Sequence, residues 1–475
     1  MTKTGELKVQ TKHFAIVLVL IIVFGTLGVV WQFDSPTSVA SSSEARPIKL
    51  GLVACYQKAE GNDMDRAAKL AVDEINAAGG VYVAEWGKYV PIELVIADTK
   101  DDSPSNAVEP VKRIVTQDNV DLLIGGYASA GTLANEVVAI ENRVPYIVTG
   151  ASTTLITRRG PQGNYSGLPA DDPKRIDDAE GMSYIFHYCV TTYSYSKTIL
   201  NFLTESMKPL LDSTYGFDQS RPLRLAIIYR NDAFGQGVVA DSKSIIIKEN
   251  LPINIVQEVN YPTTTTSFQT ELGLIKSASP DVVYVVDFIA NTAEIIKEGQ
   301  RDVGLKNLYI SVECVDEPQF YSLMGIYGDY QLIESQFGVY AQPYYLPSIG
   351  DYVTSYSEKY GKSPGFMGAS TYDAIYLAKY AIETAGTVNK TAVRDAIESS
   401  TMEQLLMMTQ TGKIEFSTGL NYHEVQILTF VEQLHYDTQI GECRAKIVYP
   451  ENLPVLGAFK QAQLVLPENY KPGSP

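Results

Sequence analysis

Short apolar runs alternate with helical patterns along the chain from Pro47 onward, and this alternation is typical of βαβ units built on a parallel sheet. The first block contains predicted strands at 48–54, 91–99, 120–125 and 145–148, and predicted helices at 64–78, 105–117 and 132–142. The helix over 64–78 ends at Gly79-Gly80, and glycine is the usual residue just past a helix end. The pattern therefore predicts a first α/β unit.

A second block with the same rhythm begins near Tyr184. Its predicted helices are 196–211, 237–250, 267–277 and 292–303, and its predicted strands are 223–229, 253–259, 281–286 and 308–312. The C-terminal part is mixed, with predicted helices at 351–360, 370–385 and 391–399 and predicted strands at 425–431 and 443–449. We expect an α/β protein with two such units.

The N-terminal segment has the composition of a membrane span. Residues 14–31 carry no charged side chain and approach the roughly 20 residues that cross a hydrocarbon core as a helix. Three lysines against one glutamate precede them, which places the N-terminus in the cytoplasm and the rest of the chain outside. A serine-rich spacer, 35–45, follows. It contains a candidate cleavage site, Ser38-Val39-Ala40, but this lies well past the apolar run, so we expect an uncleaved anchor.

The composition indicates the size of the core and excludes one class of partner. The chain has 475 residues, of which 45% are hydrophobic, enough for a large core in more than one domain. Its formal net charge is −17 and its pI is about 4.8, so its surface repels phosphate backbones and we expect no nucleic-acid partner.

The residues that enzymes use are sparse. Cysteines lie far apart without a CxxC pair, and the histidines stand alone. Gly126 to Gly131 is one residue too long for a nucleophile elbow, and Gly235 to Ala240 lacks the acid of a dinucleotide site. We therefore expect no metal, no cofactor and no catalytic residue. A surface hydrolase stays an alternative, and it would need a histidine beside Ser129.

Two turns favour ligand binding instead. Residues 125–132 and 149–154 each follow a predicted strand and bring small hydroxyls and free backbone N–H groups to its carboxyl end. Open α/β sheets bind ligands at this edge, and N–H groups at a helix start attract a carboxylate. The alternative is that both segments are ordinary turn and cap sequences.

Ten segments, in order from about Pro47 to Val448, resemble the substrate-binding proteins of branched-chain amino acid ABC transporters. Among them are IKLGLVA, AAKLAVDEINAAGGV, VKRIVTQDNVDLLIGGYASAGTLA, NDAFGQG, DVGLKNLYISVE and STYDAIYLAKYAIETAG. The resemblance implies the type I periplasmic-binding-protein fold, in which two α/β lobes are joined by a three-segment hinge and ligand is trapped between them. The implied organisation is a cytoplasmic flank at 1–13, an anchor or signal at 14–31, a linker at 32–46, lobe 1 at 47–188 and 344–424, and lobe 2 at 189–343 and 425–475.

The same resemblance implies roles for individual residues. Ser129 and the turn Ala151-Ser152-Thr153 match positions that hold the α-carboxylate of a ligand, and Glu313 matches the acid that pairs with its α-ammonium. Four further candidates depart from the family pattern or line the implied cleft. They are Phe234, where the family commonly has tyrosine; Asp287 with Phe288, where Asp287 is a candidate partner for a second ligand cation; and Tyr127.

The polar insert 158–181 is longer than the corresponding connection in the family. It carries one of two sequons, which make Asn164 and Asn389 candidates for glycosylation outside a cell.

The predicted function is an extracytoplasmic solute-binding protein held at the membrane by its N-terminal segment. It delivers an amino acid, branched-chain or otherwise apolar, to an ABC permease and catalyses nothing. An amide- or urea-binding relative and a sensor ectodomain that signals through a separate chain are the alternatives. Ligand identity, cleavage of the anchor, cysteine pairing and oligomeric state are left open by the sequence.

Overall fold

The computed structural model describes residues 44–312, 318–337, 346–450 and 462–473, all within one compact unit, Ser43–Pro475. The predicted flank 1–13, the anchor 14–31, most of the linker 32–46 and Glu313 lie outside the described residues. Over the described ranges, no helix combines the length and the apolar character that crossing a membrane requires.

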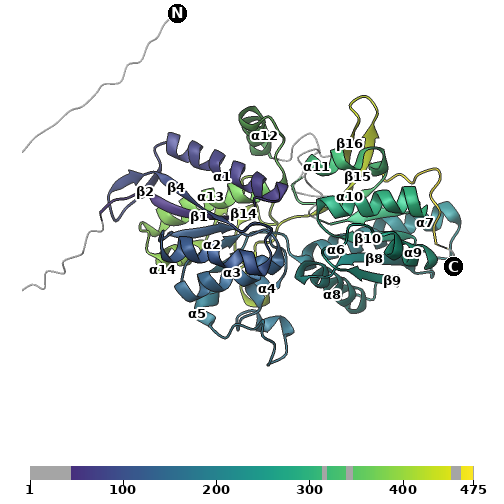
Figure 1. Ribbon diagram of the computed structural model, residues 1–475, viewed down its shortest axis with the longest axis horizontal. Helices are drawn as coiled ribbons and strands as arrows, with labels where there is room; N and C mark the ends of the chain where they lie inside the picture. Colours follow the sequence, from purple (N-terminus) through teal and green to yellow (C-terminus); the bar gives the residue numbers. More distant parts are fainter. Residues whose placement is uncertain (1–43, 313–317, 338–345, 451–461, 474–475) are drawn as a thin grey trace, which may run out of the picture. The chain divides into compact units, whose positions relative to one another are not determined.

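The first sheet contains only parallel strands, in the order β4-β1-β5-β6-β7. They are β1 (Ile48–Ala54), β4 (Ile92–Asp98), β5 (Leu122–Gly125), β6 (Tyr146–Val148) and β7 (Ile185–His187). The helices around this sheet are α1 (Ala59–Ala77), α2 (Pro104–Thr116), α3 (Ser129–Asn142), α4 (Leu155–Arg158), α5 (Ala179–Met182), α12 (Pro347–Tyr360), α13 (Phe366–Ala385) and α14 (Lys390–Glu398) (Figure 1).

The second sheet has the order β16-β15-β12-β11-β10-β8-β9, in which β15 and β16 run antiparallel to the rest. Its strands are β8 (Leu223–Arg230), β9 (Ile253–Tyr261), β10 (Val282–Val286), β11 (Leu308–Ser311), β12 (Leu332–Ser335), β15 (Phe430–Asp437) and β16 (Glu442–Tyr449). The helices that accompany it are α6 (Thr192–Phe202), α7 (Lys208–Tyr215), α8 (Ala233–Lys248), α9 (Gln269–Ser277), α10 (Ile289–Glu298) and α11 (Pro318–Met324).

Smaller elements complete the described structure. The two-stranded ribbons are β2 (Val81–Val83) with β3 (Lys88–Val90), and β13 (Met402–Glu403) with β14 (Lys413–Ile414). Short 3₁₀ segments are Asn164–Gly167, Gly325–Gly328 and Gly419–Asn421, and π-helical segments are Leu203–Met207 and Gly299–Val303.

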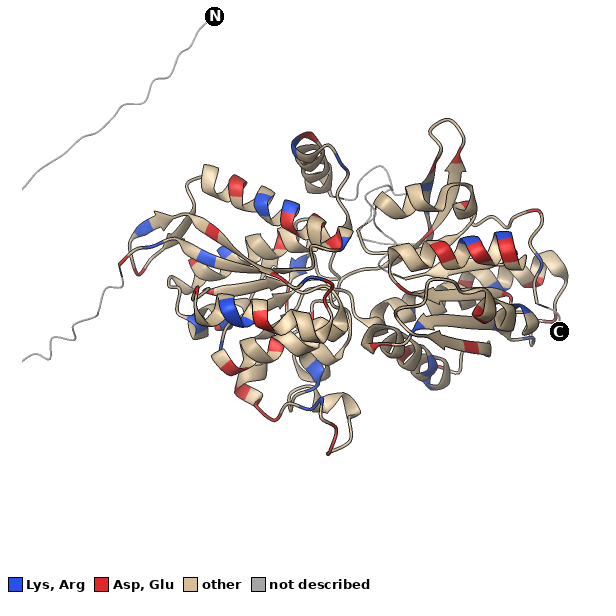
Figure 2. Ribbon diagram, in the orientation of Figure 1, with Lys and Arg blue, Asp and Glu red and all other residues tan. Residues whose placement is uncertain are grey.

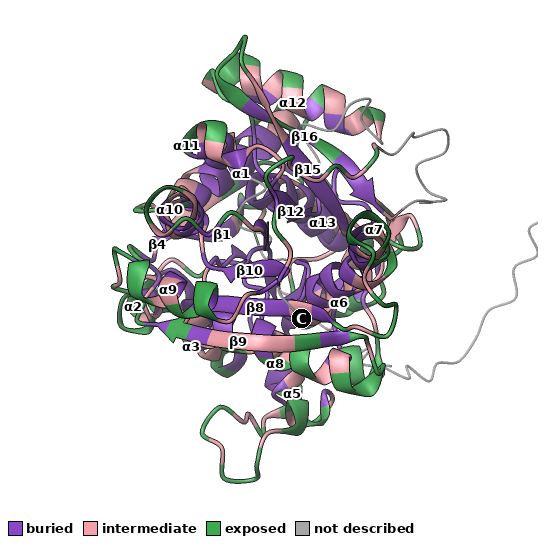
Figure 3. Cartoon of the chain, turned by 90° about the vertical axis from the view of Figure 1, so that its right-hand side faces the viewer, coloured by how far each residue is buried: buried purple, intermediate pink, exposed green. Residues whose placement is uncertain are grey.

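Burial explains why the strand sequences are continuous apolar runs and do not alternate between apolar and polar residues. Every residue of β10 is buried, because helices cover both faces of a parallel sheet. At the edge of the same sheet, β9 is mostly half-buried or exposed (Figure 3). Lys and Arg are interspersed with Asp and Glu along the outer helices (Figure 2). The predicted α/β architecture, with mostly parallel sheets flanked by helices, is confirmed.

The segment around α12 and α13 returns to the first sheet from far along the chain. Helices α1 and α13 pack side by side (Figure 1). Buried Asp63 on α1 accepts hydrogen bonds from the Tyr356 hydroxyl at 2.5 Å and from the Gly368 amide at 2.7 Å. Asp373 on α13 accepts one from the Tyr188 hydroxyl at 2.8 Å. These bonds attach residues of the C-terminal third to the first sheet.

One passage of the chain between the sheets is held by a buried ion pair. His187, the last residue of β7, pairs with Glu424. The backbone amide and carbonyl of His187 bond to the two residues that flank Glu424. The Glu424 carboxylate accepts two bonds from the Arg158 guanidinium, from Nε at 2.6 Å and Nη2 at 2.5 Å. Such two-point pairing fixes the orientation of both groups.

Several boundaries differ from the predictions. Helices α1, α3, α8 and α13 begin three to five residues earlier than expected, because small residues and glycines in their first turns have little apolar pattern. The predicted strand 425–431 is wrong over most of its length, since β15 begins only at Phe430. Val425 and Ile427 are buried in the passage between the sheets, which gives this segment its strand-like pattern.

Asp373 predicts a pH dependence of stability. Burial raises the pKa of this carboxyl to about 7, against hydrogen bonds that lower it, whereas an unfolded Asp titrates near pH 4. Between about pH 4 and about pH 7 the folded chain binds one more proton at this carboxyl than the unfolded chain does. Lowering the pH across this range therefore raises the free energy of unfolding.

We expect the thermal midpoint of the wild type to rise relative to that of Asp373→Asn as the pH falls from about 8 to about 6. Asp351→Asn, at an exposed position, is the control and should track the wild type. Parallel pH profiles for wild type and D373N would contradict the assignment.

Candidate functional site

A small, partly open cavity, too tight to admit a water molecule, lies where the carboxyl ends of strands from both sheets meet. Residues of the first sheet's turns and α13 line it together with two aromatic residues of the second sheet's turns: Tyr127, Ser129, Gly150, Ser152, Met367, Phe234 and Phe288. Small-molecule sites usually measure about 300–1,000 Å³. Here the lining residues lie so close together that no space for a water molecule is left between them.

The first wall begins with the turn between β5 and α3. Gly125 has φ of +115°, and a Cβ there would lie 2.2 Å from the Val53 carbonyl oxygen, so only glycine fits. The turn is fixed from behind by Asp102, whose carboxylate accepts from the Ala128 amide at 2.5 Å. Burial raises the pKa of Asp102 to about 6. This bond sets the backbone that presents Tyr127 and Ser129.

The second turn, after β6, brings the other predicted hydroxyls beside the first. The Thr153 amide donates to Ser129 Oγ at 3.3 Å, so the two turns are joined directly. Ser152 Oγ lies 3.0 Å from the Tyr195 hydroxyl of α6. The Ala151 carbonyl accepts from His187 Nε2 at 2.6 Å, and burial lowers the pKa of His187 to about 4, so this imidazole is neutral.

The opposite wall is aromatic. Phe234 lies in the first turn of α8, whose cap residue Asp232 accepts from the Gly235 amide at 3.1 Å. Phe288 precedes α10, and the two phenylalanine rings stack with centroids 5.4 Å apart and planes 10° apart. The Tyr127 ring lies 5.0 Å from the Phe288 ring and so connects the two walls. Each such ring pair contributes about 0.5–1.5 kcal/mol beyond its buried area.

Asp287 does not join this cavity. Its carboxylate is buried within the second sheet, where it accepts from Arg230 Nη1 at 2.9 Å and from the Tyr261 hydroxyl at 2.6 Å. Asn291 Nδ2 donates to it at 3.0 Å. The expectation that Asp287 binds a ligand cation therefore has no support in the geometry, because its oxygens already serve protein donors.

The structure thus brings together Tyr127, Ser129, Ser152, Phe234 and Phe288, with Ala151 and Thr153 in the same turn as Ser152. Gly150, within the predicted turn 149–154, also lines the cavity. Sequence reasoning missed Met367, which lines it too, and it missed Glu60. The buried Glu60 carboxylate on α1 accepts a hydrogen bond from the Tyr127 hydroxyl at 2.9 Å. A single acidic residue in a helix start gave no signal, since only the fold places it beside Tyr127.

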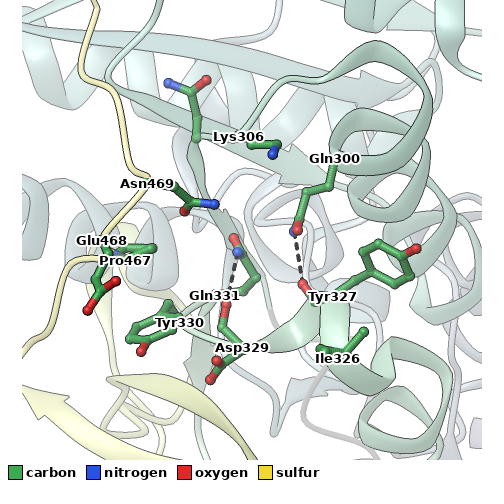
Figure 4. A pocket seen from close by; sticks show the side chains of 11 residues that line it. Gln300, Lys306, Ile326, Tyr327, Asp329, Tyr330, Gln331, Pro467, Glu468 and Asn469 are labelled. Atoms are coloured by element: carbon green, nitrogen blue, oxygen red, sulfur yellow. Dashed lines mark hydrogen bonds between the residues drawn. The ribbon is translucent and has the colours of Figure 1, made fainter.

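A larger hollow of about 520 Å³ lies elsewhere, beside the 3₁₀ segment Gly325–Gly328 (Figure 4). Its amide side chains are already engaged: Gln300 Nε2 donates to the Tyr327 carbonyl at 2.9 Å, and Gln331 Nε2 donates to the Asp329 carbonyl at 3.2 Å. None of the predicted site residues lines it. We place the candidate site at the small cavity that the predicted residues line.

Two other predicted features have defined positions. Asn164 and Asn389 are both exposed, and Asn389 caps α14 by accepting from the Thr391 and Ala392 amides at 3.1 Å each. Their glycosylation stays a prediction. Within the described ranges, His, Cys, Asp and Glu side chains nowhere gather in a group of three that could hold a metal ion.

Comparison with known proteins adds independent information. The pattern of one family, described as periplasmic binding protein, matches residues 48–430. A Leu/Ile/Val-binding protein homolog 7 of Brucella abortus is 24% identical over 311 residues, which cover 64% of this chain and 68% of the relative. A homolog 8 of Brucella suis is 23% identical over 311 residues, covering 64% of this chain and 67% of that relative.

Solved structures share the fold at low identity. The branched-chain amino acid transporter substrate-binding protein LivJ of Streptococcus pneumoniae, in complex with isoleucine, has a TM-score of 0.65 and 20% identity over 85% of this chain and 100% of that one. A solute-binding protein of an ABC transporter from Rhodopseudomonas palustris, in complex with 3,4-dihydroxybenzoic acid, has a TM-score of 0.66 and 19% identity over 88% and 98% of the two chains.

Gly125 tests whether the turn that presents Tyr127 and Ser129 is as constrained as its geometry indicates. Gly125→Ala forces a Cβ against Val53 at a positive φ, and we expect a loss of about 1–3 kcal/mol in the free energy of unfolding. Gly273→Ala is the matched control. Gly273 lies inside α9 with nothing within 4 Å of a new Cβ, so alanine there should be neutral or stabilising. Chemical denaturation measures both, and equal effects would contradict the argument.

Proposed function

The chain belongs to the periplasmic binding protein family, with the type I fold, and we propose that it is the solute-binding subunit of an ABC importer that takes an amino acid. The observation that carries the proposal is the small cavity between the two sheets. Hydroxyl-bearing turns of the first sheet and aromatic rings of the second face each other there, as a ligand with a polar end and an apolar body requires.

In the proposed binding mode, the carboxylate of the ligand lies at the start of α3. Ser129 and Ser152 offer hydroxyl donors, and the backbone N–H groups of the helix start favour negative charge. Thr153 and Ala151 shape the turn. Phe234, Phe288 and Met367 contact the apolar side chain of the ligand. Glu313 keeps its proposed role as a partner of the α-ammonium.

In this proposal, the ligand drives closure for transport by contacting both lobes. We assign lobe 1 to 47–188 with 344–424 and lobe 2 to 189–343 with 425–475, so that the passage at Glu424 is one hinge segment. A ligand that touches both walls favours the state in which they meet, since a ligand shifts an equilibrium only by its differential affinity. Entry of a ligand separates the Tyr127 and Phe288 rings, and their place is taken by its apolar body.

The partner and the location follow from the same proposal. An ABC permease receives the ligand-bound form, and the N-terminal segment 14–31 holds the protein at the outer side of the cell membrane. This arrangement keeps the binding protein close to its permease. The sensor alternative requires a separate signalling chain instead.

An aromatic carboxylate is the second candidate ligand. Three aromatic rings, those of Tyr127, Phe234 and Phe288, meet at the cavity, and such rings stack readily on a planar ligand. The Rhodopseudomonas palustris relative in complex with 3,4-dihydroxybenzoic acid has the same fold. Both candidates share the carboxylate end.

Thermal unfolding of the ectodomain from Arg46 onward, freed of co-purified ligand, tests the proposal. A ligand at about a hundred times its Kd adds about 2.7 kcal/mol of stability. We expect apolar amino acids to raise the midpoint, and amides, urea and sugars to leave it unchanged. A panel in which no carboxylate stabilises the protein would contradict the proposal.

Ser129→Ala should weaken binding of the stabilising ligand about 10- to 100-fold, because a hydrogen bond to a charged group is worth about 1.5–3 kcal/mol. Ser105→Ala is the control, at an exposed position of α2. Titration calorimetry measures both. Equal affinities for S129A and wild type would remove Ser129 from the site.

A further inference from the structure

Glu60 is a buried acid beside the cavity. It lies in the first turn of α1, its residue is 3% exposed, and its carboxylate accepts from the Tyr127 hydroxyl at 2.9 Å. Tyr127 in turn contacts the Phe288 ring of the opposite wall. The acid is therefore one side chain away from the space in which the ligand is proposed to lie.

No Lys, Arg or His of the described ranges forms an ion pair with Glu60. The cation whose charge acts on it through space is Lys58, which is exposed. Burial raises the pKa of Glu60, because an acid taken out of water without a basic partner loses its solvation. Burying this carboxylate is therefore unfavourable, and a positive charge brought into the cavity would offset the lost solvation.

Among the described residues beside the opposite wall, acids outnumber the base that contacts Phe288. That base is Arg230, whose guanidinium lies 4.0 Å from the Phe288 ring centroid. It is already bound by two acids, Asp232 at 2.6 Å and Asp287 at 2.9 Å. Together with Glu60, these described groups carry more negative than positive charge, which disfavours a ligand that is only an anion.

The aromatic rings complete a site for a cation. Tyr127 contacts the acid through its hydroxyl and the Phe288 ring through its own ring, and the electron-rich faces of aromatic rings attract ammonium groups within about 6 Å. An acid held by a tyrosine hydroxyl next to such rings is suited to a cationic nitrogen.

We propose that the ligand carries a cationic nitrogen in addition to its carboxylate, and that Glu60, oriented by Tyr127, is the residue that selects for it. This rests on the proposed function and decides between its two candidate ligands, since an aromatic acid without an amine lacks the required charge. The nitrogen is either the α-ammonium of an amino acid, which Glu60 then shares with Glu313, or an amine on its side chain.

The test compares ligands that differ only in this charge. Titration calorimetry uses leucine, 4-methylpentanoate, which is leucine without its amine, and lysine, which carries a second amine. The wild type should bind at least one of the two amino acids about tenfold or more tightly than 4-methylpentanoate. Leucine and lysine separate the two sources of the nitrogen: a loss of leucine affinity in Glu60→Gln assigns Glu60 to the α-ammonium, and a loss confined to lysine assigns it to the side-chain amine.

Glu60→Gln should remove that preference. It keeps the shape and the hydrogen bond from Tyr127 but loses the charge, so the affinity for the preferred amino acid falls about tenfold or more while that for 4-methylpentanoate holds or improves. Tyr127→Phe, which frees Glu60 from its orienting bond, should reduce the preference by a few fold. Glu74→Gln is the matched control: Glu74 lies on the same helix and accepts bonds from the Tyr372 and Tyr376 hydroxyls at 2.5 and 3.0 Å.

The outcomes are distinct. A wild type that binds 4-methylpentanoate as tightly as both amino acids overturns this inference and leaves the proposed function standing. An unchanged preference in E60Q, or an equal loss in E74Q, likewise overturns it. A wild type that binds none of the three ligands contradicts the proposed function itself.

Discussion

The contact between the Tyr127 and Phe288 rings is the interaction on which the site depends. It joins the carboxyl edges of the two sheets, with ring centroids 5.0 Å apart, beside a buried apolar cluster that contains residues of both sheets. Each ring is set by its own sheet: Tyr127 by the glycine turn after β5, and Phe288 by the start of α10. A ligand that binds here has to replace this contact with contacts of its own to both sides.

The buried acids around this contact differ in whether a basic residue pairs with them. At the passage between the sheets, Glu424 is matched by Arg158, and in the second sheet Arg230 is matched by Asp232 and Asp287. Glu60 lacks such a match among the described residues, and it touches Tyr127. Paired acids hold the frame in one geometry, whereas an acid without a base beside the cavity is available to a ligand.

Much of the fold and part of the site follow from the sequence. Alternating strand and helix patterns predict both sheets, and hydroxyl-rich turns after β5 and β6 predict Ser129 and Ser152, because carboxyl ends of parallel strands meet at one edge. Contacts set by packing between distant segments were not predictable. Glu60 and Met367 reach the cavity from helices, and Asp287 is bound by Arg230, which lies on the neighbouring strand β8 but 57 residues away in the chain. Strand β15 was misplaced for the same reason, since buried passage residues mimic a strand.

Hydrogen exchange with and without a stabilising amino acid tests the central claim most directly, that one ligand contacts both walls of this cavity. The account predicts slower exchange of the amides at 126–132 and 150–155 together with those at 233–238 and 288–292, at the same ligand concentration. Protection confined to one of these walls, or centred on the hollow beside Gln300 and Gln331, would contradict it.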